Sequence, residues 1–385
     1  MKKTASRWVD KLVEAGLAEA GEPLLGVRQD GIRSSGDARR RELLRRLLDE
    51  LGDTAVLIAR PAEPYGSIVD FLARRAKGVV RPQDSETQVL LGDLPVAPRP
   101  TAENLLPRLA ERSCAIAPGG IVIARGQQSA EQAFIAFSSV CFACYVKLFS
   151  DRLADLRDGR SDSEAREVVA AAIEIDAPPG TEDASAPETL RDIPAPYRSV
   201  DEVHRALSEI GRRTVTSGLV GAYFGNVSYR LGDTLYISRS RSSLDELEGR
   251  IVPCPLDEAG SAPPTASREL PAHLRIVKST KKRAVLHGHP RYAVIASLAR
   301  DSDQSSDACS VRGVPIVRGE IGGGPRGLAR TVPPALESSP AAIVRGHGVF
   351  ATGAESLVEA FDSLLETELE CRAEVLDELG LRPPR

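Results

Sequence analysis

The sequence predicts an α/β protein with two domains. Short apolar runs of strand length alternate along the chain with longer segments whose apolar residues recur at helical spacing. A total of 385 residues is long enough for two hydrophobic cores. Residues 176–196 are rich in proline and small polar residues, a composition typical of a linker. We therefore expect strands packed among helices, in α/β or α/β/α domains, on both sides of this linker.

Composition and charge exclude several classes of function. The chain is 42% hydrophobic and 27% charged, which is ordinary for a soluble globular protein. Its formal net charge of -4 gives no general attraction for nucleic acid or for an anionic membrane. The sequence contains no run of about 18 apolar residues, the length needed to span a bilayer. Its basic N-terminus lacks the apolar core of a signal peptide. We predict a cytoplasmic protein with no nucleic acid and no membrane as partner.

The part of the chain before the linker is predicted to alternate helices and strands. Helices are expected over residues 3–20, 39–48, 67–77 and 129–156. Strands are expected at residues 55–59 and, as a pair, within residues 113–124. The stretch from residue 26 to residue 36 is expected to be a loop.

The cysteines could carry chemistry or could simply be part of the core. Six cysteines are scattered through the chain, which argues against a disulfide framework. Cys141 and Cys144 form a C-x-x-C pair, the spacing of redox and zinc motifs. Their surroundings are continuously apolar, and no second cysteine pair or neighbouring histidine completes a zinc site. The pattern favours a buried helix, in which cysteine behaves as a small hydrophobe.

After the linker the alternation continues to the end of the chain. Helices are expected over residues 200–217, 268–279, 292–300 and 357–379. Strands are expected at residues 225–230, 234–238, 284–290, 314–317 and 341–351, with a turn at 322–325.

Histidines in this second part mark a candidate metal site. The chain has only five histidines, and His287 and His289 fall together in His-Gly-His. Residues two apart on a strand project to the same face, so both imidazoles can reach one point. His347 lies between glycines that allow close backbone approach to a metal or substrate. Three imidazoles would hold Zn²⁺ and leave coordination sites open, as in a catalytic zinc. The alternative is a strand end with solvated imidazoles.

A catalytic zinc requires a proton carrier beside it. An open zinc can bind adjacent oxygens of a hydroxy-ketone or related substrate and stabilise an enediolate. Glu269, in Ser267-Arg268-Glu269, is the leading general acid/base candidate near such a metal. Without a metal, a glutamate in the first turn of a helix is more often a capping or surface residue.

These motifs resemble those of the class II aldolase/adducin family, whose type member cleaves fuculose phosphate. The resemblance covers residues from about 200 to 380. Gly225-Asn226-Val227-Ser228 is similar to the family's substrate-phosphate loop, and Ile237-Ser238-Arg239-Ser240-Arg241 is similar to its second anion loop. Ser267-Arg268-Glu269 is similar to its Ser-Ser-Glu motif. His287-Gly288-His289 is similar to its His-x-His motif, and Gly346-His347-Gly348 is similar to the segment that holds its third zinc ligand.

The resemblance implies roles for individual residues. His287, His289 and His347 would bind Zn²⁺, for which manganese, cobalt or iron could substitute, and Glu269 would be catalytic. Five further residues would bind the substrate or its anionic group, namely Asn226, Ser240, Arg241, Ser267 and Arg268. The implied fold is an α/β/α sandwich around a mostly antiparallel sheet. The implied assembly is a homo-oligomer, a dimer or tetramer, with sites at subunit interfaces.

Two arginines depart from the family pattern. Arg241 stands where the family has glycine, and Arg268 replaces the second serine of Ser-Ser-Glu. Arginine favours bidentate contact with carboxylate or phosphate, so the anion site could be re-aimed. In the alternative, both side chains point to solvent or pair with Asp245 or Glu246.

The two parts of the chain also resemble each other. Residues 55–61 match residues 284–290 at Ala, Val, Leu and Pro, and both parts continue to a Gly that precedes a long helix. This alignment places Ile58, Arg60 and Gly119 at the positions of the three histidines. We therefore expect tandem class II aldolase-like sandwiches. The boundaries are a degenerate lobe without metal at 1–160, a linker at 161–198 and a catalytic lobe at 199–385.

The expected function is that of a zinc-dependent lyase of the aldolase type. It would cleave or rearrange a small phosphorylated or carboxylated sugar-like substrate through a metal-stabilised enediolate. The family also contains epimerases, dehydratases and decarboxylases, so the fold does not choose the reaction. A non-catalytic, adducin-like binding or assembly module is the other alternative. Retention of the three histidines and Glu269 favours the enzyme, because a binding module has no need of them.

Overall fold

The computed structural model describes residues 4–28, 31–33, 38–176, 194–221, 223–257, 263–300, 309–319 and 327–381. It divides into two compact units, which we call the first lobe (Met1–Ala177) and the second lobe (Pro178–Arg385). The division falls inside the predicted linker. Residues 177–193 of that linker, and the turn predicted at 322–325, lie outside the described residues.

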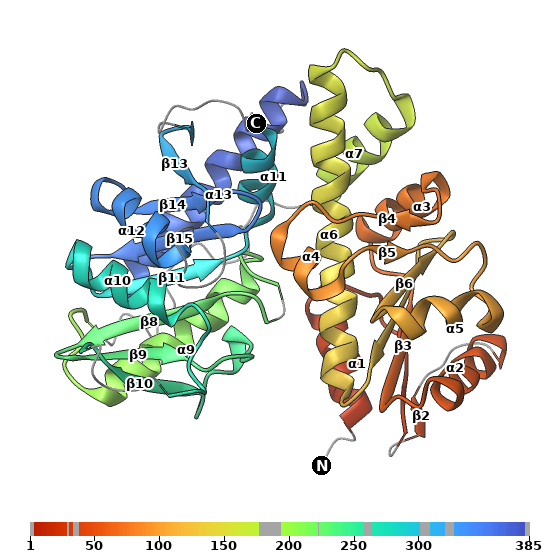
Figure 1. Cartoon of the computed structure of the whole chain (residues 1–385), viewed down its shortest axis with the longest axis horizontal. Helices are drawn as coiled ribbons and strands as arrows, with labels where there is room; N and C mark the ends of the chain where they lie inside the picture. The colour runs from red at the N-terminus through yellow and green to blue at the C-terminus, as the bar shows by residue number, and fades with distance from the viewer. Residues whose placement is uncertain are drawn as a thin grey trace. The chain divides into compact units, whose positions relative to one another are not determined.

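The first lobe is built on a five-stranded antiparallel sheet of order β2-β1-β3-β7-β6. Its strands are β1 (Leu24–Val27), β2 (Gly31–Arg33), β3 (Ala55–Ala59), β6 (Cys114–Ala117) and β7 (Ile121–Gly126). One face is covered by α6 (Ala130–Arg157), against which α1 (Thr4–Glu14) and α3 (Tyr65–Arg75) pack (Figure 1). On the other face, leucines of α2 (Ala38–Leu51) and α5 (Ala102–Glu111) form a core with Val56, Ile58 and Ile123. The sheet therefore lies between two helical layers.

The apolar helix predicted at 129–156 is α6. By length and composition α6 could cross a membrane, but 89% of its most apolar window is buried inside the structure. Cys141 and Cys144 lie in this helix, buried and without a disulfide, and burial raises the pKa of the Cys144 thiol to about 12. The prediction of a core helix is confirmed, and these inert thiols do not have the exposure that redox chemistry requires.

The predicted loop at 26–36 is wrong, because it contains the end of β1 and all of β2. Glycine at position 26 suggested a loop, but its role is packing. A Cβ at Gly26 would lie 2.5 Å from Leu48 Cδ1 and 2.9 Å from Leu44 Cδ2, so glycine lets the strand pass close to α2 without displacing these leucine side chains. The helix predicted over 3–20 is also shorter than expected, ending at Glu14.

Part of the predicted linker is helical. Residues 163–175 form α7 (Ser163–Ile175), whose N-terminus is capped by the Asp162 side chain accepting a hydrogen bond from the Ala165 amide. Val169 and Ala172 are buried, and α7 packs against α3 and α6. The linker-like composition begins only at residue 176, so the predicted boundary of 161 was placed too early. The smaller elements of this lobe are β4 (Val79–Val80), α4 (Ser85–Leu91) and β5 (Leu94–Pro95).

The second lobe is built on an eight-stranded sheet of order β10-β9-β8-β11-β15-β14-β13-β12, in which only β13 and β14 pair in parallel. Its strands are β8 (Asn226–Leu231), β9 (Thr234–Ser238), β10 (Ile251–Pro255), β11 (Ala284–Gly288), β12 (Ser310–Val311), β13 (Val314–Val317), β14 (Ala341–Val344) and β15 (Gly348–Gly353).

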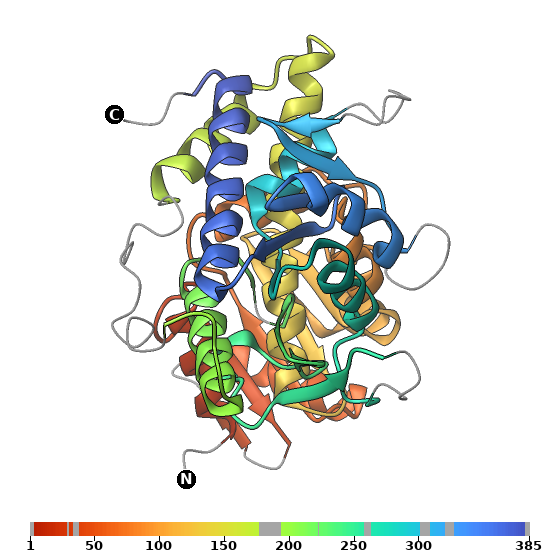
Figure 2. The same ribbon diagram turned by 90° about the vertical axis from the view of Figure 1, so that its left-hand side faces the viewer.

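Helices cover both faces of this sheet. One layer contains α9 (Val200–Thr216) and α13 (Leu357–Glu378), with α11 (Arg291–Ala299) packed against α13 (Figure 2). The opposite layer contains α10 (Leu270–Thr280) and α12 (Leu328–Ser338), whose apolar residues share a core with the sheet. The predicted α/β/α sandwich around a mostly antiparallel sheet is confirmed for this lobe.

The strand predicted at 341–351 is a hairpin. β14 and β15 are antiparallel, and His347 lies in the turn between them. Gly346 adopts a left-handed φ of 64°, which a continuous strand would not need. A 3.0 Å hydrogen bond from the His347 amide to the Val344 carbonyl closes this turn.

The central strands of the two sheets follow the same order, β1-β3-β7-β6 in the first lobe and β8-β11-β15-β14 in the second. Ala55 pairs with Gly126, and Ala284 pairs with Gly353. Counted from these pairs, the position of His347 falls on Gly120, so the predicted alignment with Gly119 is wrong by one residue. The sequence alignment could not locate the insertion that precedes this turn, because the pairing of the strands is not visible in the sequence. Duplication of an aldolase-like lobe stays a prediction.

Candidate metal centre

Two antiparallel neighbours, β11 and β15, bring the three predicted histidines together. His287 and His289 lie at the C-terminal end of β11, and His347 directly precedes β15. Because the strands run in opposite directions, these two ends lie side by side. Glycine is required at 348, since a Cβ there would lie 2.4 Å from the Gly288 carbonyl oxygen and 3.1 Å from His287 Cε1.

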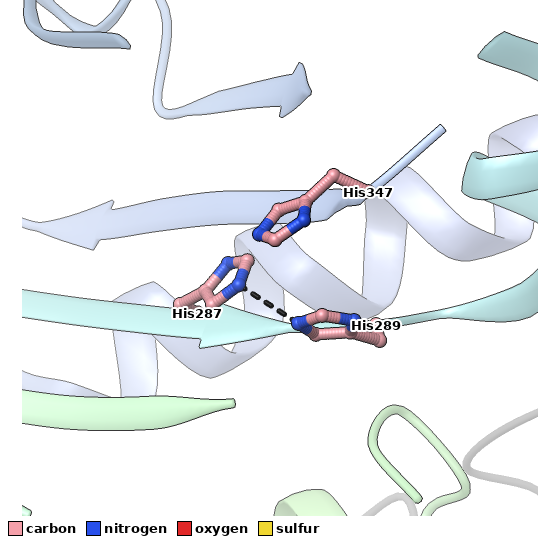
Figure 3. A group of neighbouring side chains, drawn as sticks. All are labelled: His287, His289 and His347. Carbon is pink, nitrogen blue, oxygen red and sulfur yellow. Dashed lines mark hydrogen bonds between the residues drawn. The ribbon is translucent and has the colours of Figure 1, made fainter. Parts of the chain in front are cut away.

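The three imidazoles point toward one another (Figure 3). The Nε2 atoms of His287 and His289 are 2.9 Å apart, and one candidate ligand atom from each of the three rings lies within 4.8 Å of the others. All three residues are at most 3% exposed. Three buried nitrogens at this spacing form a set that can hold one metal ion.

Second contacts fix the orientation of these rings. The Nδ1 atom of His287 is 2.9 Å from the Val349 carbonyl oxygen, which only accepts hydrogen bonds, so Nδ1 carries the proton and Nε2 presents a lone pair. His287 also stacks on Phe350, with ring centroids 4.1 Å apart. His289 stacks on Phe224 at 5.5 Å. The nitrogens available for a metal are therefore preorganised by the sheet.

Glu269 joins the histidines at the start of α10. Its Oε1 lies 3.2 Å from His347 Nε2, and its Oε2 lies 3.4 Å from His287 Nε2. Asn226 Nδ2 donates a hydrogen bond of 2.7 Å to Oε2. Although Glu269 occupies the N-cap position, its side chain makes no capping hydrogen bond. The carboxylate is therefore directed into the site and not toward the helix amides.

Burial favours the neutral forms of His287 and His289, and the imidazoles that face Glu269 favour its ionised form. Burial lowers the pKa of His287 to about 4 and that of His289 well below its ordinary value. Burial opposes ionisation of Glu269, but the facing His287 and His347 outweigh it and lower the pKa of this carboxyl. Near neutral pH the site presents imidazole lone pairs and a carboxylate.

This donor set fits a divalent cation. His287 Nε2 and Glu269 Oε2 lie 3.4 Å apart, and both are hydrogen-bond acceptors because Nδ1 of His287 carries the proton. A cation between two such acceptors would offset their repulsion. Imidazole with a carboxylate suits Zn²⁺, Mn²⁺, Fe²⁺ or Co²⁺.

His273 is a buried polar residue that the sequence analysis missed, and it contacts Ser228 of the predicted phosphate loop. His273 lies one turn after Glu269 on α10, and its Nδ1 is 2.7 Å from the Ser228 hydroxyl. Burial lowers the pKa of His273 to about 3, and its ring packs edge-on against Phe350 at 5.8 Å. The four-residue spacing from Glu269 was the signal available in the sequence. Phe350 thus contacts both His273 and His287.

Ser240 and Ser267, two of the predicted anion-binding residues, lie at the same end of the sheet as the histidines. An isolated bridge joins Arg239 to Ala266, so the second predicted anion loop lies beside the Ser267-Arg268-Glu269 motif. Ser267 Oγ accepts a hydrogen bond from the Glu269 amide, and the Ser240 amide donates to the Thr265 carbonyl.

The two departing arginines are both exposed. Within the part of the chain that the structure describes, neither Arg241 nor Arg268 forms an ion pair, including with Asp245 or Glu246. Arg241 has a φ of 59°, the left-handed conformation that favours the glycine which the family has here. The arginine thus adopts a backbone conformation that is common for glycine and uncommon for other residues.

The same register positions in the first lobe hold no such cluster. Ile58 is buried in the core. The Arg60 guanidinium is paired with Glu63 at 2.6 Å, and a Cβ added to Gly120 would lie 3.3 Å from Arg60 Nε. The arginine therefore lies over the glycine that corresponds to His347.

Comparison with known proteins connects this site to a family. Residues 205–375 match the sequence profile described as Class II Aldolase and Adducin N-terminal domain. The second lobe belongs to the class II aldolase and adducin family. The resemblance drawn from the motifs is confirmed for this class II aldolase-type lobe. The matched region starts after the linker, so the same character in the first lobe stays a prediction.

Different relatives are named for different activities. The 3,4-dihydroxyphthalate decarboxylase of Terrabacter sp. (strain DBF63) is 27% identical over 189 residues, which are 42% of this chain and 78% of the relative. The structure of l-fuculose-1-phosphate aldolase from Thermus thermophilus is 27% identical, with a TM-score of 0.41, over 48% of this chain and 98% of its own. A sugar-phosphate aldolase from Thermotoga maritima is 22% identical, with a TM-score of 0.39, over 48% and 98%.

Proposed function

We propose that the second lobe is a metal-dependent carbon–carbon lyase of the class II aldolase type. The observation that carries the proposal is the convergence of three imidazoles with Glu269 in one buried cluster. His287, His289 and His347 would hold the metal, most simply Zn²⁺. The ion, when bound, would supply a Lewis acid for oxygens on which negative charge develops.

The chain's own residues would handle the proton and the position of the substrate. Glu269 would take a proton from the substrate, or return one, through its carboxylate oxygens. The Asn226 amide holds Glu269 Oε2 in place, which limits the orientations of the base. Phe224, stacked on His289, would keep water from one side of the cluster.

The substrate would be a small, hydroxylated anion with a phosphate or carboxylate group. Ser240, Arg241, Ser267 and Arg268 are the proposed contacts for its anionic group, with the exposed arginines available to it. Retro-aldol cleavage and decarboxylation both break a carbon–carbon bond and leave its electron pair on one of the two carbons. The decarboxylase relative supports the second reaction as strongly as the aldolase names support the first. Epimerisation and dehydration would use the same proton transfer.

The first lobe would be catalytically silent and would serve packing or assembly. Arg60, at the register position of His289, forms an ion pair with Glu63, so the two charges neutralise each other. A homo-oligomer, dimer or tetramer, would be in keeping with the family. An adducin-like binding module without catalysis is the competing function for the whole chain.

Turnover by metal-loaded protein tests the proposal. Purified protein is stripped with a chelator, reloaded with Zn²⁺, Mn²⁺ or Co²⁺, and assayed against phosphorylated ketoses, hydroxy-acids and dihydroxylated aromatic acids. We expect turnover of at least one class with the loaded protein and none with the stripped protein. A protein that takes up no metal, or takes it up and turns over nothing in these classes, would support the binding module.

A further inference from the structure

Helix α11 begins directly after the His-Gly-His segment and is held at its start by another helix. Its N-cap is a proline, which makes no side-chain capping bond. Glu368 of α13, only 1% exposed, supplies the acceptors instead. The Tyr292 amide donates 2.9 Å to Glu368 Oε1, and the Ala293 amide donates 2.8 Å to Oε2. The first turn of α11, which follows His289 closely, is therefore anchored to α13.

The last turn of α11 reaches the turn that carries His347. Ser297 is fully buried, and its Oγ accepts a hydrogen bond of 3.0 Å from the Gly346 amide. The single hydroxyl proton of Ser297 goes to the Val294 carbonyl at 2.7 Å, so the oxygen meets Gly346 as an acceptor. One helix thus joins two ligand segments that belong to different strands.

Gly346 differs from its neighbours in how its amide is bonded. The amides of Arg345 and His347 donate to backbone carbonyls at 2.9 and 3.0 Å, bonds that depend on no side chain. The Gly346 amide donates to the side chain of Ser297, and Gly346 is buried with a left-handed φ of 64°. A buried amide that loses its acceptor destabilises the conformation that buries it. Removal of the Ser297 hydroxyl would therefore act directly on this turn.

We propose that Ser297 is a positioning residue for His347 and acts through Gly346. Its hydroxyl fixes the turn, and the turn fixes the direction of the His347 imidazole relative to His289 at the other end of α11. Without the hydroxyl, the turn would have more conformations to lose when a metal binds, so the metal would bind more weakly. This inference rests on the proposed function, and it adds a residue that lies outside the five segments of the family resemblance.

Binding of Co²⁺ to the metal-free protein tests the inference without any turnover. Co²⁺ is titrated into wild type and Ser297→Ala, and binding is followed by calorimetry and by the visible spectrum of the cobalt. We expect the dissociation constant to rise about tenfold in Ser297→Ala, because a hydrogen bond to a buried amide contributes on that scale. Ser139→Ala is the matched control. Ser139 is a fully buried helical serine of the first lobe whose Oγ donates 2.7 Å to the Ile135 carbonyl, and its loss should leave Co²⁺ affinity unchanged.

A second background separates positioning from general stability. In His347→Ala the turn no longer carries a ligand, so adding Ser297→Ala should change the Co²⁺ dissociation constant by less than about twofold. The titration of these two variants extends to the higher Co²⁺ concentrations that the remaining two imidazoles require. A serine that only stabilises the fold would weaken binding by the same factor in both backgrounds.

Ser297→Cys keeps the volume with a weaker acceptor and serves the same cycle if Ser297→Ala does not fold. Unchanged Co²⁺ affinity in the folded Ser297 variants, or an equal loss with and without His347, would overturn the inference alone. Failure of the wild type to take up Co²⁺ would overturn the proposed metal site together with it.

Discussion

Where the second lobe carries His289, the first lobe carries Arg60, and the surrounding charges differ accordingly. The Arg60 guanidinium brings its own positive charge, which Glu63 neutralises at 2.6 Å. His289 is neutral and faces another imidazole lone pair at 2.9 Å. Related strand registers thus support a self-neutralised pair in one lobe and a cluster that can hold an added cation in the other.

The backbones on which these side chains stand share close contacts. A Cβ at Gly126 would lie 1.9 Å from the Ser129 carbonyl oxygen, and one at Gly353 would lie 2.0 Å from that of Ser356. In each lobe the serine then caps the long helix that follows. The strand-to-helix connection is therefore under the same steric constraint in both lobes, while the site end of the sheet is free to differ. The same strand-to-helix connection is therefore compatible with different side chains at the opposite end of the sheet.

Removal of one histidine should give the largest difference between the lobes. Wild-type protein loaded with Zn²⁺ should hold one ion per chain, and His289→Ala should hold almost none, because two imidazoles bind far more weakly than three. Arg60→Ala, the same register position in the first lobe, should leave the metal content unchanged. Elemental analysis after gel filtration measures both. Equal metal in wild type and His289→Ala would remove the ligand assignment.

Replacement of Glu269 should separate chemistry from metal binding. Glu269→Gln keeps the shape and removes the base, so turnover of an identified substrate should fall by ~10²–10⁴-fold while three histidines remain for the metal. Glu63→Gln in the first lobe is the control and should retain wild-type turnover. The side chain of Glu269 caps no helix amide, so a purely structural glutamate is already a poorer account. Wild-type turnover by metal-loaded Glu269→Gln would exclude it from the mechanism.

The sequence was informative where one residue type has few uses. His-Gly-His at a strand end predicted two converging rings, and the strand pairing of β11 confirms that geometry. The long apolar helix and its cysteines were also predicted correctly, because continuous apolarity leaves little choice but burial.

Long-range packing decided the features that sequence did not reveal. Gly26 looked like a loop residue, but its contact with leucines of α2 places it in a strand. His347 looked like a strand residue, and the left-handed Gly346 turns the chain there into a hairpin. The Asn226–Glu269 bond joins residues 43 positions apart, so no local pattern could predict it.

A buried ion pair in the first lobe should dominate its stability. Asp53 and Arg125 form two hydrogen bonds of 2.6 Å, with side chains only 3% and 9% exposed. Arg125→Met leaves an uncompensated buried carboxylate and should lower the free energy of unfolding by about 3–5 kcal/mol. Trp8, the only tryptophan, lies in the first lobe and packs on Phe134, so its fluorescence during urea unfolding reports this change.

A double variant provides the control for that measurement. Replacing Asp53 by leucine together with Arg125→Met removes both charges and should recover part of the lost stability, since no unpaired ion remains. A double variant less stable than Arg125→Met would show that the pair acts through packing and not through charge.

The same register positions in the second lobe should respond far less. Lys282 and Thr352 stand where the first lobe has Asp53 and Arg125. Lys282 Nζ donates 2.9 Å to Thr352 Oγ1, but it also donates to the carbonyls of Leu336 and Ser339 at 3.1 Å. Thr352→Val keeps the volume and leaves the ammonium two acceptors, so the free energy of unfolding should fall by only about 1 kcal/mol.

Far-UV circular dichroism during urea unfolding would measure this loss, while Trp8 fluorescence should retain its wild-type midpoint because it reports the first lobe. The comparison between lobes then depends on how many acceptors a buried charge has. Arg125 shares its charge with one carboxylate and one carbonyl, that of Leu109, whereas Lys282 has three neutral acceptors. If Thr352→Val costs as much as Arg125→Met, the two carbonyls cannot hold the ammonium by themselves, and the two positions would be energetically equivalent despite their different chemistry.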